Sequence, residues 1–278
     1  MLGALIIVFR EVIEAGLIVG IVLAVTKGVH GSRWLAALGV AAGVAGACLV
    51  AAFAGALANA LAGIGQEVFN ASILLLAVAM LTWHNVWMAS HGRELAAEVG
   101  KVGAEVREGT KGVAALGVVI AVAVMREGSE VALFLYGLAA SSGSSGWQLL
   151  AGGGLGLALG VGVTALTYFG LVTIPTRWLF RVTTVLIGFL AAGLAAQAMS
   201  FLQQAGLVTA LENTAWNSSA ILSDTSLFGR VLHTLIGYTD QPSQLQVVAY
   251  LVVLIGGFAL SKAFAPSHAP RRRVAAAE

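Results

Sequence analysis

The chain has 278 residues, of which 59% are hydrophobic and only 10% charged, and its mean hydropathy is +0.92. About a quarter of the residues of a soluble domain are charged, so this composition excludes a soluble protein and predicts an all-α integral membrane protein. The formal net charge of +2 is too small to suggest nucleic-acid binding, and the one cysteine, Cys48, allows no internal disulfide.

Seven apolar stretches of the chain are each long enough to cross a bilayer, which takes about 20 residues in a helix. They cover residues 3–26, 34–58, 67–90, 113–139, 149–174, 179–202 and 245–264. We therefore expect a single transmembrane domain, built as follows: repeat one 1–90, a connection 91–112, repeat two 113–202, a loop 203–244 and a seventh helix, with residues 266–278 as a tail.

The basic residues predict the orientation of these helices. Of the 15 lysines and arginines, 12 fall in the first, third and fifth connections or at the C-terminus, and the opposite connections hold only Arg230. The remaining two, Arg10 and Arg126, lie inside predicted helices. Because basic residues favour the cytoplasmic side, we expect the N-terminus outside and the C-terminus in the cytoplasm.

Two charged motifs interrupt the first and fourth apolar stretches. They read Arg10-Glu11-Val12-Ile13-Glu14 and Arg126-Glu127-Gly128-Ser129-Glu130. An ionisable side chain in mid-membrane costs roughly 2.5–3.5 kcal/mol on insertion scales, so the six together cost about 15–20 kcal/mol unless they pair, bind an ion or face water. On a helix the three charges of each motif project to one side, which allows such pairing.

The two motifs indicate an internal repeat, because the second follows the first at a shift of 116 residues and the similarity continues beyond it. The first helix runs inward and the fourth outward, so the repeat is inverted. Helices 1–3 and 4–6 should then be related by a two-fold axis in the membrane plane, with the seventh helix added outside the 3+3 repeat, and the motifs should meet at mid-depth.

The four glutamates of the motifs predict an all-oxygen metal site. Glu11, Glu14, Glu127 and Glu130 would supply carboxylate ligands, which suit hard cations, and the Ser129 hydroxyl is a candidate addition. Arg10 and Arg126 would reduce the net charge of the six from −4 to −2 and hold the carboxylates by bidentate pairing. The alternative is that each motif is an ion pair that fastens the two repeats together.

Other polar residues have more ordinary interpretations. The connection 91–112 has apolar residues at helical spacing between charged ones, which predicts a helix on the membrane surface or on the bundle. His84, Met88 and His91 lie near the inner end of the third helix, where we expect interfacial polar residues rather than metal ligands.

Glycine stripes in helices 34–58 and 149–174 predict close contacts, with each other or with another subunit.

The extracytoplasmic loop 203–244 contains a predicted short amphipathic helix after Ser223-Asp224-Thr225-Ser226. Asp224 is the expected N-cap of that helix. Asp224 and Glu212 could also collect cations before they reach the membrane.

The paired motifs resemble those of the oxidase-dependent iron permease family, which includes fungal high-affinity ferric permeases and bacterial iron-uptake permeases. The resemblance extends to the outer-loop stretch from Leu222 to His233, to Gly237-Tyr238 and to His91-Gly92-Arg93. It implies that the four motif glutamates carry iron, with Arg10 and Arg126 required beside them.

The resemblance further implies a transporter rather than an enzyme, located in the bacterial cytoplasmic membrane, with iron as its substrate and no prosthetic group. Some relatives carry a fused extracytoplasmic domain, so here we expect a separate extracytoplasmic protein that binds or oxidises iron, and a homo-oligomer in the bilayer. The alternatives are a permease for another hard cation such as manganese or lead, or a structural or enzymatic membrane subunit.

Overall fold

The computed structural model of the protein describes residues 1–61, 65–142, 145–170 and 176–264, so the predicted tail 266–278 lies outside the described residues. The described residues form helices and contain no strand. In chain order the helices are α1 (Leu2–Val25), α2 (Ser32–Leu61), α3 (Gln66–Arg107), α4 (Ala114–Ser142), α5 (Gly146–Tyr168), α6 (Thr176–Gln204), α7 (Leu227–Ile236) and α8 (Gln244–Ala263).

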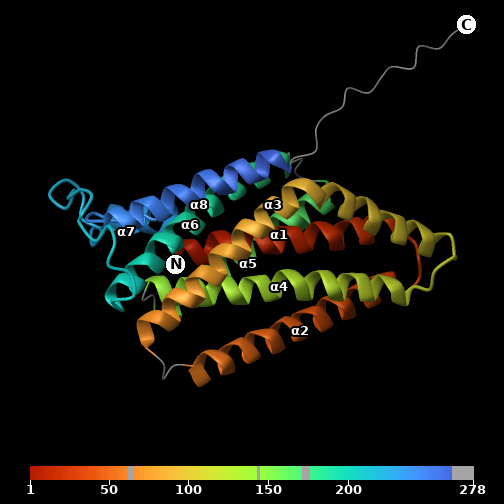
Figure 1. Ribbon diagram of the computed structural model, residues 1–278. Coiled ribbons are helices and arrows are strands. Elements are labelled where there is room, and N and C mark those ends of the chain that lie inside the picture. The colour runs from red at the N-terminus through yellow and green to blue at the C-terminus, as the bar shows by residue number, and fades with distance from the viewer. Residues whose placement is uncertain (62–64, 143–144, 171–175, 265–278) are drawn as a thin grey trace, which may run out of the picture.

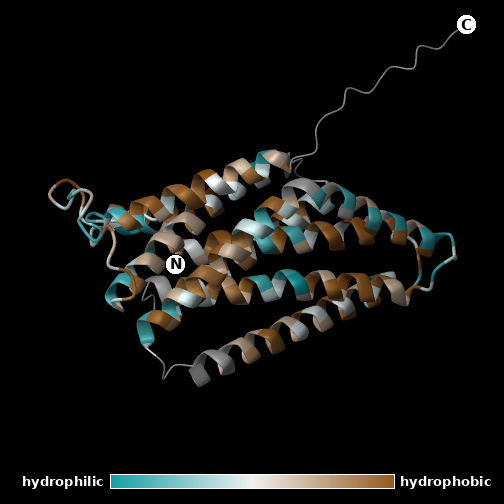
Figure 2. Ribbon diagram, in the orientation of Figure 1, coloured by the Kyte–Doolittle hydropathy of each residue, from teal (hydrophilic) through white to brown (hydrophobic). Residues whose placement is uncertain are grey.

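The seven long helices lie side by side in one bundle (Figure 1). The N-terminus and α7 lie toward one end of it, and the connection from α3 to α4 lies at the other. Hydrophobic residues dominate the middle of the bundle, and hydrophilic residues collect at its two ends and in a band halfway along α4 (Figure 2).

Among the residues that the structure describes, five helices contain a membrane-length apolar segment. These segments are Ser32–Ala56, Gln66–Met88, Gly146–Tyr168, Arg181–Gln204 and Gln244–Ala263. Helices α1 and α4 have 24 and 29 residues and are therefore also long enough to cross a bilayer, but each carries three charged residues. The protein is thus an all-α, multi-pass membrane protein.

Helix α3 differs from the sequence prediction, because it continues without a break into the predicted connection 91–112 and ends at Arg107. Its 42 residues span about 63 Å at 1.5 Å per residue, roughly twice the hydrocarbon thickness. The second half packs along the bundle, where Val99 and Val106 are buried against Ile18 and Val22 of α1. No proline interrupts α3, and Gly109, at φ +80°, follows its end.

The two glycine stripes pack against different helices and not against each other. In α2, a Cβ atom on Gly43 would lie 2.7 Å from the Ala121 carbonyl oxygen of α4. In α5, a Cβ atom on Gly156 would lie 2.6 Å from the Leu5 carbonyl oxygen of α1. Only glycine allows such an approach, so these positions set the distance between the paired helices.

The connection 203–244 forms the predicted short helix, but its N-cap was predicted wrongly. Ser226, not Asp224, is the N-cap of α7, and its Oγ accepts a hydrogen bond from the Gly229 amide at 2.9 Å. The backbone amide of Asp224 instead donates to Asp240 Oδ2 at 3.3 Å. The helix ends at Gly237 in the left-handed conformation, which lies against Gly193 of α6.

Candidate metal site

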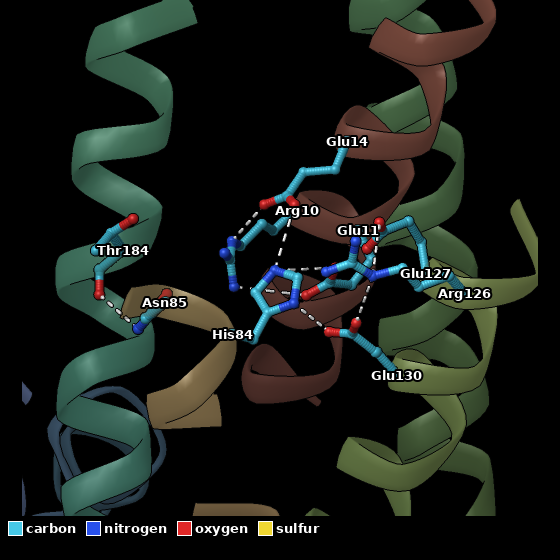
Figure 3. Close-up of polar contacts among 9 residues, drawn as sticks. All are labelled: Arg10, Glu11, Glu14, His84, Asn85, Arg126, Glu127, Glu130 and Thr184. Carbon is cyan, nitrogen blue, oxygen red and sulfur yellow. Dashed lines mark hydrogen bonds and ion pairs between the residues drawn. The ribbon is translucent and has the colours of Figure 1, made fainter. Parts of the chain in front are cut away.

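The two charged motifs meet inside the bundle, where α1 packs against α4 (Figure 3). Arg10 and Glu11 are each 1% exposed, Glu127 3% and Glu14 4%. Four charged side chains buried this completely require close partners, because an unpaired buried charge costs several kcal/mol.

Each arginine forms an ion pair with both glutamates of its own motif. Arg10 Nε lies 2.8 Å from Glu14 Oε1, and Arg10 Nη1 lies 3.6 Å from Glu11 Oε1. In the second motif Arg126 Nε lies 3.3 Å from Glu130 Oε1 and 3.9 Å from Glu127 Oε1. The same internal pairing therefore orients the carboxylates in both motifs.

The surroundings of the two arginines differ. Arg10 is buried, whereas the Arg126 side chain is 36% exposed and its guanidinium lies over the Trp87 ring of α3, 4.2 Å from the ring centroid. This cation–π contact partly replaces the water that an exposed guanidinium would bind. The second motif is thus the more open of the two in this conformation.

His84 of α3 joins the two motifs, which corrects the expectation of an interfacial residue. Its side chain is 3% exposed and lies between the carboxylates of α1 and α4 (Figure 3). The Nδ1 atom contacts Glu130 Oε2, and Nε2 lies 3.3 Å from Glu14 Oε2 and 3.9 Å from Glu11 Oε2. These partners come from helices distant in the chain, so local sequence patterns did not indicate them.

One ligand atom each from Glu11, His84, Glu127 and Glu130 lies within 4.8 Å of the others. Opposite ligands of a small octahedral cation, with bonds of about 2.1 Å, are about 4.2 Å apart, so a slight contraction would place the four around one ion. Both carboxylate oxygens of Glu11 and one of Glu127 are buried and accept no hydrogen bond from a described donor. The arrangement suits a multivalent cation.

Apolar side chains enclose this charged layer on both sides. Toward the α7 end lie Ile7 and Phe134, in a cluster with Leu81. Toward the other end lie Ile18 and Ile120, in a second cluster. An ion in the layer would thus be separated from water at both ends of the bundle, which strengthens its attraction to the carboxylates.

The other predicted site residues lie apart from the cluster. The Ser129 hydroxyl donates to the Met125 carbonyl oxygen of its own helix at 2.6 Å. Asp224 is half-buried and Glu212 exposed, and both lie in the connection between α6 and α8. The structure therefore unites both arginines and all four motif glutamates, together with His84, which sequence reasoning did not include.

A helical bundle with several membrane-length apolar helices and a buried cluster of acidic residues defines a multi-pass membrane protein with charged groups in its interior. Comparison with known proteins gives the family. Residues 1–264 match the iron permease FTR1 family, and the chain belongs to that family.

The chain is similar to three bacterial proteins named ferrous iron permease EfeU. Those of Escherichia coli O157:H7 and Shigella sonnei are each 33% identical to it over 255 residues, which cover 90% of this chain and 91% of theirs. That of Yersinia pestis is 32% identical over 254 residues, covering 90% of this chain and 89% of its own. No solved structure matches the chain. The protein is thus a membrane permease of an iron-transporting family and not an enzyme.

Proposed function

We propose that the protein moves iron ions inward across the bacterial cytoplasmic membrane through the site where its two Arg-Glu-x-x-Glu motifs meet. Glu11, Glu14, Glu127 and Glu130 would carry the ion. The observation that supports this most is the buried cluster, in which ligand atoms from α1, α3 and α4 lie within 4.8 Å of one another. The relatives named ferrous iron permeases favour Fe²⁺ as the ion.

In this proposal Arg10 and Arg126 hold the carboxylates in position and lower the net charge of the site. The ion pairs within each motif support that role. Four carboxylates alone would bind a multivalent cation tightly, and a transporter must also release it. Ser129 would contribute only if its hydroxyl oxygen turned toward the ion, and Asp224 and Glu212 would collect cations at the outer surface.

We further propose seven crossing helices, α1 to α6 and α8, in a single transmembrane domain over 1–265 with an inverted 3+3 repeat. The glycine contacts support the repeat, because Gly43 faces Ala121 in one helix pair and Gly156 faces Leu5 in the other. Ala121 and Leu5 are related by the same shift of 116 residues as the motifs. The equivalent contact therefore occurs at the equivalent place in each repeat.

The proposed orientation places the N-terminus and α7 outside and the long extension of α3 in the cytoplasm. The distribution of basic residues supports this, because Lys101, Arg107 and Lys111 all lie at or near the end of α3, opposite α7 (Figure 1). An inside-negative potential would then drive a divalent ion inward with about 4.6 kcal/mol per 100 mV.

Iron would reach the site from a separate extracytoplasmic protein that binds or oxidises it, and the permease would function as a homo-oligomer in the bilayer. The direct test is iron flux into liposomes that contain the purified full-length protein. We expect inward flux of Fe²⁺ that other hard divalent ions inhibit only weakly. Flux of manganese in preference to iron would instead make this a permease for another cation.

A further inference from the structure

We infer that His84 is a ligand of the transported ion and that its imidazole makes the site selective for Fe²⁺ over harder cations such as Mn²⁺, Mg²⁺ and Ca²⁺. This inference rests on the proposed iron site and specifies its chemistry. Carboxylates alone suit Mg²⁺, Ca²⁺ and Mn²⁺, whereas an imidazole nitrogen suits Fe²⁺ and the later transition metals.

The position of the His84 ring permits ligation. It lies between α1 and α4, with Nδ1 against Glu130 and Nε2 within 3.9 Å of Glu11 and Glu14. A neutral imidazole donates from one nitrogen and has a lone pair on the other. The ring can thus keep a hydrogen bond to the carboxylate on one side and bind an ion on the other, the arrangement in which carboxylates commonly orient histidine ligands.

The histidine also breaks the two-fold symmetry of the site. Buried positions of α3 correspond to buried positions of α6 at a shift of 113 residues, as in Leu74 with Ile187 and Leu81 with Leu194. This shift places Gln197 at the position equivalent to His84. The carboxylates come in equivalent pairs, but the nitrogen comes from one repeat only, so it adds a feature that the repeated motifs do not supply.

The neighbouring residues of α3 fix the ring in this place. Asn85 is buried and turned away from the motifs, and its side-chain amide approaches the Thr184 carbonyl oxygen of α6 at 3.5 Å. Leu81, one turn before His84, is fully buried in the apolar cluster beside the site. With α3 held on both sides, His84 faces the carboxylates of α1 and α4, as Figure 3 shows.

The test is iron K-edge X-ray absorption of the full-length protein loaded with one Fe²⁺ per chain in the absence of oxygen. We expect the outer-shell scattering of a coordinated imidazole in the unmodified protein and in His30→Gln, which changes an exposed histidine in the connection between α1 and α2. The signal should disappear in His84→Gln. We also expect the ratio of Fe²⁺ to Mn²⁺ flux into liposomes to fall at least about 10-fold in His84→Gln. The same ratio should be unchanged in His30→Gln.

An oxygen-only shell around the iron bound to the unmodified protein would overturn the inference, and this result needs no variant to fold. An unchanged ratio of Fe²⁺ to Mn²⁺ flux in folded His84→Gln would do the same. Either result is compatible with a transport site made of carboxylates, whereas absence of iron flux in the unmodified protein would refute the proposed function itself.

Discussion

Adding a single methyl group at the glycine contacts should loosen both helix pairs equally. The Cβ atom of Gly43→Ala would lie 2.7 Å from a carbonyl oxygen of α4, and that of Gly156→Ala 2.6 Å from one of α1. Ordinary contact begins near 3.4 Å, so the helices would have to separate by about 0.7–0.8 Å, a gap that forfeits a quarter to a half of each dispersion contact nearby. Overpacking of this kind costs about 1–3 kcal/mol.

The gain in helix propensity from glycine to alanine, about 1 kcal/mol, opposes this cost, so we expect a net loss of up to about 2 kcal/mol for each variant. Thermal unfolding in detergent, followed by circular dichroism, measures it. The matched control is Gly154→Ala in α5, where a Cβ atom meets nothing within 4 Å and stability should stay the same or rise. If Gly43→Ala and Gly156→Ala melted at the same temperature as this control, the proposed close packing would be wrong.

Three further predictions concern the topology, the outer loop and the arginines. A reporter fused after Arg273 should be cytoplasmic and one inserted within 205–220 extracytoplasmic, and finding both on one side would contradict the seven-helix topology. Ser226→Ala should destabilise α7 by about 1 kcal/mol, whereas Asp224→Asn should keep the melting temperature but lower uptake at limiting iron, and unchanged uptake would exclude a collecting role. Arg10→Lys should reduce iron flux per folded molecule, because an ammonium group cannot pair with Glu11 and Glu14 together as the guanidinium does. Full flux in this variant would show that any positive charge suffices.

The composition and the lengths of the apolar stretches were enough to predict the helical class and the long helices. The pairing of the motif side chains was also predictable, since three charges on one helix face inside a membrane must find partners. The spacing of Arg10 and Glu14 implied the ion pair between them. These are local properties, which depend on helix geometry alone.

The missed features depend on contacts between distant segments. His84 lies in a stretch rich in aromatic residues near a predicted helix end, and only the packing of α3 against α1 and α4 reveals that it is buried. The partners of Gly43 and Gly156 depend on which helices pair. The cap of α7 was misplaced because Ser223, Asp224 and Ser226 are all good capping residues, and the surrounding loop decides among them.

The most direct test of the transport site is iron flux into liposomes containing Glu14→Gln or Glu130→Gln, with the amount of folded protein measured in each sample. Glutamine keeps the size of the side chain and removes one negative charge, so most of the protein should stay folded. The control is Glu105→Gln on the extension of α3, outside the charged layer. The Lys111 ammonium holds the pKa of Glu105 below its ordinary value, so this substitution also removes a negative charge.

Both motifs contribute to one site in this account, so flux should collapse in either variant and stay unchanged in Glu105→Gln. If the motifs only fasten the repeats together, Glu14→Gln and Glu130→Gln should melt at lower temperature, and the molecules that remain folded should transport iron normally. Normal iron flux per folded molecule in both variants would contradict the transport site.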